Sequence, residues 1–93
     1  MKVIDAFDLD WLLQCGFKKT EHVMWFNHPR TEYTWTPKGR RKPTILIFEN
    51  EEPDWCPDAN RKVYFVNNAQ YYYDDIPDFL IDLIKNEIIV EEV

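Results

Sequence analysis

A stripe of apolar residues near the C-terminus constrains the fold more than any other feature of this chain. The spacing of these residues is that of a helix with one apolar face: Ile76, Phe79, Leu80, Leu83 and Ile84. Asp75 is suited to cap this helix, and Pro77 falls in its first turn, where the missing N–H costs nothing. Such a helix is stable only when another layer covers its apolar face.

Alternating patterns elsewhere in the chain predict that this layer is a β-sheet. Residues 31–36 give the clearest strand, because Tyr33 and Trp35 alternate with polar residues. Residues 21–27 form a second candidate strand, although both of its faces are partly apolar. The His-Pro-Arg sequence at 28–30 is expected to turn the chain between them, so the two segments predict a hairpin.

Three more segments extend the predicted sheet. Residues 44–49 are apolar on both faces, as in a central strand. Residues 62–66 and 69–73 flank two asparagines at 67–68, and asparagine tolerates the positive φ angles of a type I′ turn. A second hairpin is therefore expected. Residues 88–90 either add an edge strand or extend the C-terminal helix.

A short helix is predicted over residues 8–15. Asp8 suits the N-cap, Leu9, Leu12 and Leu13 follow helical spacing, and Gly16 stands where a left-handed residue ends a helix. The element order predicts an α+β fold, with an antiparallel sheet of four to five strands and with the N-terminal and C-terminal helices packed on one face. The opposite face of the sheet is then partly open to water.

Size and charge indicate one domain with an acidic end. A chain of 93 residues, 45% of them hydrophobic, forms a single small core over residues 1–93. The formal net charge is -6. Residues 74–93 hold seven acids and one base, Lys85, whereas residues 1–73 hold ten of each. The acidic C-terminal end thus accounts for the net charge. Within the rest of the chain, residues 38–42 hold four bases and residues 49–58 hold five acids, so the surface is expected to be bipolar.

The sequence predicts a cytoplasmic protein with no membrane contact. The longest strongly apolar run, residues 45–48, is far shorter than the roughly 20 residues that span a bilayer. Asp5, Asp8 and Asp10 interrupt what would have to be the apolar stretch of a signal peptide. Cys15 and Cys56 are expected to be free thiols.

No catalytic, cofactor-binding or metal-binding residue is predicted, and the protein is not expected to be an enzyme. The chain contains no serine, and its two glycines lie too far apart for a phosphate-binding loop. The sequence around Cys56 lacks a second, resolving cysteine. His22 and His28 on one strand would lie about 20 Å apart at ~3.3 Å per residue, too far for one metal ion.

A basic turn offers one binding hypothesis. Between two prolines, four bases stand within five residues: Lys38, Arg40, Arg41 and Lys42. Tyr33 and Trp35 precede this turn, and aromatic rings beside bases are typical of single-stranded nucleic-acid binding. The same two rings also fit a core-facing stripe, and the net charge repels phosphate at long range. Nucleic-acid binding is therefore the alternative hypothesis.

Aromatic content gives the leading hypothesis, a protein-docking surface. Four Trp and five Tyr exceed what a core of this size needs, and the run 71–73 must place Tyr72 on the face opposite its two neighbours. Aromatic side chains are enriched at protein interfaces. Tyr72, Trp35 and Trp55 are the predicted protein-binding residues. The expected partner is another protein, bound by a monomer or a small homo-oligomer.

Both ends of the chain resemble short uncharacterised reading frames of bacteria and their phages. The resemblance lies in the segments LDWLLQCGFKK and IPDFLIDLIKNEIIVEEV. Such proteins are often accessory factors that bind one host or phage protein. The resemblance implies a similar role here and transfers no catalytic residue.

Overall fold

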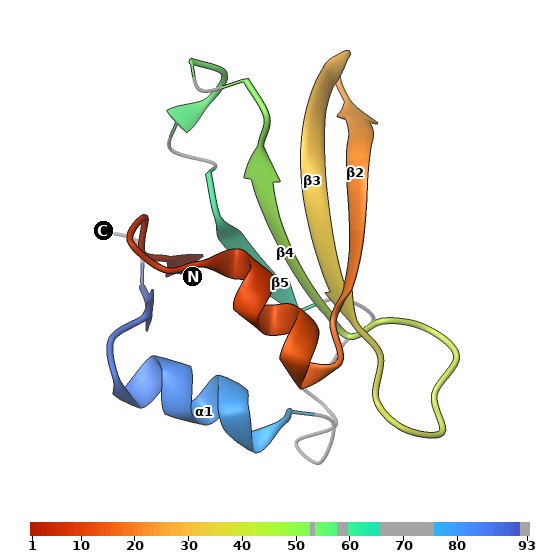
Figure 1. The fold of residues 1–93 in the computed structure, drawn as a ribbon, viewed down its shortest axis with the longest axis vertical. Coiled ribbons are helices and arrows are strands. Elements are labelled where there is room, and N and C mark those ends of the chain that lie inside the picture. The colour runs from red at the N-terminus through yellow and green to blue at the C-terminus, as the bar shows by residue number, and fades with distance from the viewer. Residues whose placement is uncertain (53, 58–59, 66–75, 92–93) are drawn as a thin grey trace.

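The structure, a computed structural model, describes residues 1–52, 54–57, 60–65 and 76–91. Its elements, shown in Figure 1, are β1 (Lys2–Val3), η1 (Leu9–Cys15), β2 (Lys18–Trp25), β3 (His28–Trp35), β4 (Ile45–Asn50), β5 (Lys62–Phe65), α1 (Asp78–Lys85) and β6 (Ile89–Val90). The described strands form one antiparallel sheet in the order β2-β3-β4-β5-β1-β6. This arrangement confirms a mostly antiparallel sheet combined with two helices.

The described sheet has six strands rather than the four to five expected from the sequence. The difference comes from β1 and β6, which are two residues long each and lie side by side at one edge. Two residues are too few to produce an alternating pattern, so β1 left no sequence signal. The expected strand at 69–73 lies outside the described residues, as does the asparagine turn at 67–68.

The β2–β3 hairpin turns earlier than predicted. Trp25 pairs with His28, so the turn residues are Phe26 and Asn27, with φ angles of 49° and 64°. Two successive positive φ values are those of a type I′ turn, whose twist matches the flanking strands. The prediction of a turn at residues 28–30 was wrong, because Pro29 fits within the start of β3.

The first helix begins and ends as predicted but is a 3-10 helix. The side chain of Asp8 accepts a hydrogen bond from the Asp10 backbone N–H at 3.0 Å. Gly16 has a φ of 95°, and the Phe17 N–H donates to the Leu12 carbonyl at 3.2 Å. This left-handed ending directs the chain straight into β2.

The second helix is shorter than its predicted stripe. Leu80 and Leu83 are buried, but Ile84 is 40% exposed, so its expected place in the core was wrong. The backbone N–H of Ile88 already bonds to the Leu83 carbonyl at 2.9 Å, and the chain leaves the helix there to form β6. The predicted cap, Asp75, lies outside the described residues, and Pro77 occupies the N-cap position.

Both helices contribute buried residues to one core. Leu12 of η1 and Leu80 of α1 join Ile45, Ile47 and Val63 in this core. Figure 1 shows η1 in front of β4, whereas α1 contacts β6 at the edge of the sheet. The turn into β6 holds the C-terminal end of α1 at that edge, whereas Phe79 near the other end packs on Phe17 and Trp35. The expectation of two helices on one face is therefore met in part.

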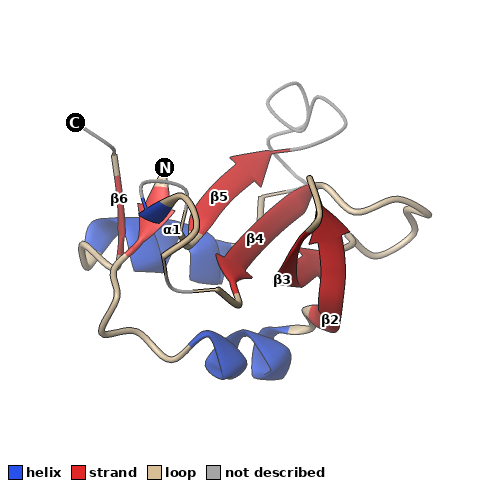
Figure 2. Cartoon of the chain, turned by 90° about the horizontal axis from the view of Figure 1, so that it is seen from above, coloured by secondary structure: helices blue, strands red, loops and turns tan. Residues whose placement is uncertain are grey.

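Strand alternation leaves a second face of the sheet opposite this core. Ile45 and Ile47 point into the core, so Leu46 and Phe48 of the same strand point away from it. Figure 2, viewed along the sheet, shows η1 on one side of β2–β4. We call the side that carries Leu46 and Phe48 the outer face. No helix among the described residues is long and apolar enough to cross a bilayer.

Candidate functional site

A ladder of stacked side chains crosses the outer face from β2 to β5. The Arg30 guanidinium carbon lies 4.6 Å from the Trp25 ring centroid and 4.3 Å from that of Phe48. Phe48 in turn stacks on Tyr64, with centroids 5.9 Å apart and rings inclined by 9°. These contacts follow from the register, which places one member of the ladder on each of four neighbouring strands.

Arg30 in the ladder is buried with its charge compensated. Its Nε and Nη2 atoms lie 2.7 Å and 2.5 Å from the Oε2 atom of Glu32, two residues along the same face of β3. The arginine is 8% exposed. A buried guanidinium is stable when it is paired and stacked in this way. Arg30 therefore serves as a rigid support for the rings on either side.

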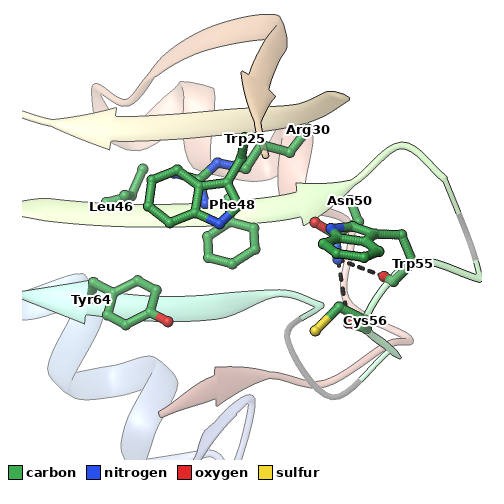
Figure 3. Close-up of a pocket in the computed structure, with 8 residues that line it drawn as sticks. All are labelled: Trp25, Arg30, Leu46, Phe48, Asn50, Trp55, Cys56 and Tyr64. Carbon is green, nitrogen blue, oxygen red and sulfur yellow. Dashed lines mark hydrogen bonds between the residues drawn. The ribbon is translucent and has the colours of Figure 1, made fainter. Parts of the chain in front are cut away.

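An apolar groove of about 460 Å³ lies along this ladder. Its lining is drawn in Figure 3: Trp25, Arg30, Leu46, Phe48, Asn50, Trp55, Cys56 and Tyr64. Trp25 and Tyr64 are 49% and 46% exposed, so large rings face water beside it. Concave apolar surfaces of this size are typical of binding sites. We call this feature the outer groove.

The loop after β4 forms one wall of the outer groove. The Asn50 side-chain amide donates to the backbone carbonyls of Trp55 at 2.9 Å and of Cys56 at 3.4 Å (Figure 3). The Trp55 ring stacks on His28, with centroids 3.6 Å apart and an interplanar angle of 12°. Contacts from β3 and β4 thus hold Trp55, a predicted protein-binding residue, against the outer face.

An acidic hollow of about 530 Å³ adjoins the outer groove across Trp55. It is lined by His28, Glu51, Glu52, Asp54 and Trp55. His28 Nδ1 lies 2.8 Å from Glu52 Oε2. The hollow therefore gathers carboxylates at one end of an otherwise apolar groove.

A β-bulge brings a second histidine to the same acidic loop. The register of β2 shifts between Thr20 and Val23, and His22 has a φ of 58°. Its backbone N–H donates to Glu51 Oε2 at 2.9 Å, and its Nδ1 atom lies 2.7 Å from Glu51 Oε1. The assumption that His22 and His28 share one strand was wrong, because the hairpin turn separates them. Within the described residues, no three His, Cys, Asp or Glu side chains are grouped as metal ligands.

The other predicted protein-binding residues do not join Trp55. Trp35 packs at the edge of the core, where its ring lies 6.2 Å from that of Phe79. It also sits close to Gly16, where an added Cβ would lie 3.7 Å from the indole nitrogen. Trp35 and Trp55 are thus on opposite faces of the sheet. Tyr72 lies outside the described residues.

The basic turn lies at the end of the sheet opposite the acidic hollow (Figure 1). Its bases are exposed in the loop between β3 and β4: Lys38, Arg40, Arg41 and Lys42. Figure 1 shows this loop at the bottom of the sheet, whereas the β2–β3 turn and the loop after β4 are at the top. The bipolar surface predicted from the charge pattern therefore has its basic end away from the acidic hollow.

Tyr33, one of the aromatics before the basic turn, belongs to a structural network. Its hydroxyl donates to Asp10 Oδ1 at 2.8 Å, and Lys19 Nζ contacts the same oxygen at 2.9 Å. The Lys19 hydrogen bond holds the pKa of Asp10 below its usual range, with Tyr33 adding to the effect. Burial raises the pKa of Tyr33 to about 12, and the bond to Asp10 acts in the same direction. This network connects η1 with β2 and β3.

Sequence reasoning missed most of the groove residues, among them Trp25, Phe48 and Tyr64. One signal was present, because residues 44–49 are apolar on both faces and so require cover on each. The second face of that strand is the floor of the groove. Comparison of the chain with protein-family models, with curated proteins and with solved structures gave no match.

Proposed function

We propose that this protein is a non-enzymatic protein-interaction domain whose outer groove receives an apolar side chain of a partner protein. The observation that carries the proposal is an apolar groove of about 460 Å³ bordered by half-exposed Trp25 and Tyr64. Aromatic rings held in fixed positions lose little conformational freedom on binding, so they are effective interface residues. The proposal includes the expectations that the protein acts in the cytoplasm and is a phage-type accessory factor.

The position of the groove in the fold supports this function. Its lining comes from β2, β3, β4, β5 and the loop after β4, while the buried residues of η1 and α1 belong to the core on the other side. We infer that the helices leave the outer face to a partner. The side chains of Arg30 and Asn50 in the outer groove are held by hydrogen bonds, and this rigidity favours docking without a large rearrangement.

The alternative, single-stranded nucleic-acid binding through residues 38–42, is less well supported. Stacking platforms need exposed rings beside the bases. Tyr33 is 3% exposed, and Trp35 packs against the core. The four bases are exposed, as phosphate contacts require. Binding of an oligothymidylate is therefore measured beside the peptide selection.

Selection from a displayed random-peptide library tests the proposal. The full chain is the target, and a Leu46→Lys variant, which places a charge on the groove floor, is used for counter-selection. We expect enriched peptides to share an apolar anchor residue and to bind Leu46→Lys at least tenfold more weakly. Ile81→Lys is the matched control, because Ile81 is an exposed apolar residue on α1. Circular dichroism and urea unfolding establish that each variant folds.

Three results would contradict the proposal. The first is a selection in which no peptide is enriched on the wild-type chain relative to Leu46→Lys. The second is a set of enriched peptides that bind the wild-type chain and Leu46→Lys equally. The third is tight binding of a fluorescent oligothymidylate that is lost when the four bases 38–42 are reversed to Glu and that falls steeply between 50 and 200 mM salt. Tyr64→Ala gives a second groove variant in case Leu46→Lys does not fold.

A further inference from the structure

We propose that the partner segment carries a Lys or Arg within a few residues of its apolar anchor, so that the anchor enters the outer groove and the base enters the acidic hollow. This inference rests on the proposed function and specifies the chemistry of the partner. It follows from the arrangement of two adjoining hollows, one apolar and one acidic, that share the side chain of Trp55.

The shared wall makes the two hollows one continuous surface. Trp55 lines both, and its ring is fixed by the stack on His28 at 3.6 Å and by the Asn50 bond to its carbonyl at 2.9 Å. A peptide whose apolar side chain contacts Leu46 and Phe48 can therefore continue past Trp55 into the acidic hollow. Beyond that ring its next side chains meet carboxylates.

Charge complementarity favours a basic side chain of the partner in the acidic hollow. Glu51, Glu52 and Asp54 line the acidic hollow. Among the described residues, His22 contacts Glu51 and His28 contacts Glu52, while Asp54 is exposed. In the outer groove, Arg30 is already held by Glu32. An acidic partner segment would thus be repelled, whereas a cation also gains a contact with the indole ring.

The positive charges of the basic turn do not cancel the negative charge of the acidic hollow. Residues 38–42 lie at the other end of the sheet from the acidic hollow (Figure 1), and salt at 0.1 M screens exposed charges over about 10 Å. The chain as a whole carries a net charge of -6. Long-range attraction and local contacts therefore favour the same kind of partner, a segment that is both basic and apolar.

Defined peptides test the inference. The probes are acetylated and amidated nonapeptides built from Gly, Ser and Gln, with one central Phe and with Arg, Gln or Glu placed two to four residues away. Binding to the full-length, ¹⁵N-labelled chain is followed by NMR titration. We expect the Arg peptide to bind roughly 3- to 10-fold more tightly than the Gln peptide, and the Glu peptide to be the weakest.

Matched variants locate the effect. Asp54→Asn should bring the ratio of Arg-peptide to Gln-peptide affinity close to one while leaving the Gln-peptide affinity unchanged. Asp82→Asn, which removes an exposed acid on α1, should leave the ratio as in the wild type. Raising the salt from 50 to 300 mM should reduce the ratio but not the Gln-peptide affinity. Glu52→Gln provides a second charge variant that retains an acceptor for His28.

The other outcomes distinguish failure of this inference from failure of the proposed function. If the Phe peptides bind but Arg, Gln and Glu give equal affinities, the inference is wrong and the proposed docking function stands. If an Arg peptide without Phe binds as well as one with Phe, the contact is unspecific attraction and the inference is also wrong. If no Phe peptide produces shifts around Trp55 and Tyr64, the proposed function itself fails.

Discussion

Replacing Arg30 with Ala should destabilise the outer face and lower the free energy of unfolding of the protein. The change removes two cation–π contacts, to Trp25 and Phe48, each worth from about 0.5 kcal/mol at an exposed site to about 2 kcal/mol at a desolvated one. It also removes two charge-assisted hydrogen bonds and leaves the Glu32 carboxylate, whose side chain is 18% exposed, without its partner. Partial rehydration of Glu32 offsets some of this cost. The expected loss in the free energy of unfolding is about 2–4 kcal/mol.

Urea and thermal unfolding, followed by circular dichroism, measure this loss. For a domain of this size, a loss of that magnitude lowers the Tm by roughly 10–20 °C. Arg30→Lys keeps the charge but not the planar group that stacks, so it should be intermediate. Arg41→Ala, on an exposed loop residue, is the control and should change stability by less than about 0.5 kcal/mol. A loss below about 1 kcal/mol for Arg30→Ala would refute the view that Arg30 supports the groove.

Further predictions concern the core, the pH response and the thiols. Leu80→Ala, at a fully buried position, should cost roughly 2–5 kcal/mol in urea titration, and a loss under about 1 kcal/mol would show that α1 does not complete the core. Because folding raises the pKa of Tyr33 from 10.0 to about 12, stability should fall as the pH rises from about 10 to 12, and Tyr33→Phe should abolish that part of the loss. Because folding lowers the pKa of Asp10 below 3.8, its contribution is present above that pH and should disappear at more acid pH, a change that Asp10→Asn removes. Iodoacetamide at pH 8 should modify exposed Cys56 faster than Cys15, whose pKa is raised by burial, as mass spectrometry of timed samples would show; equal rates would contradict the difference in exposure. Cys56→Ala should leave stability nearly unchanged, whereas a bulky maleimide on Cys56 should obstruct the outer groove and weaken peptide binding.

Local signals in the sequence were sufficient where a few neighbouring residues decide the conformation. Asp8 and Gly16 bound the first helix because a cap and a left-handed ending act within one turn. The alternation of residues 31–36 located β3, and the two-sided apolar run 44–49 located β4. The strand β6 was one of two alternatives left open for residues 88–90.

The candidate site was predicted only in part, because its residues are distant in the sequence. Trp55 was singled out for its residue type, but its position on the outer face depends on His28 and Asn50. Trp35 was singled out for the same reason and lies on the other face. Residue type alone does not distinguish these two tryptophans, since the distinction depends on which strand face and which loop each belongs to.

What the sequence by itself determined is therefore the longer elements of the fold, and what the tertiary structure decided is the short edge strands and the surface that the elements build. Caps, turns and alternation act over a few residues, so an α+β domain with an antiparallel sheet followed from local patterns. The insertion of β1 between β5 and β6 depends on pairing between distant segments. The bulge that precedes Val23 is contacted by Glu51 of the loop after β4, which accepts a hydrogen bond from the His22 backbone N–H. The outer groove exists because that register aligns Trp25, Arg30, Phe48 and Tyr64 across four strands, an alignment that no single segment encodes.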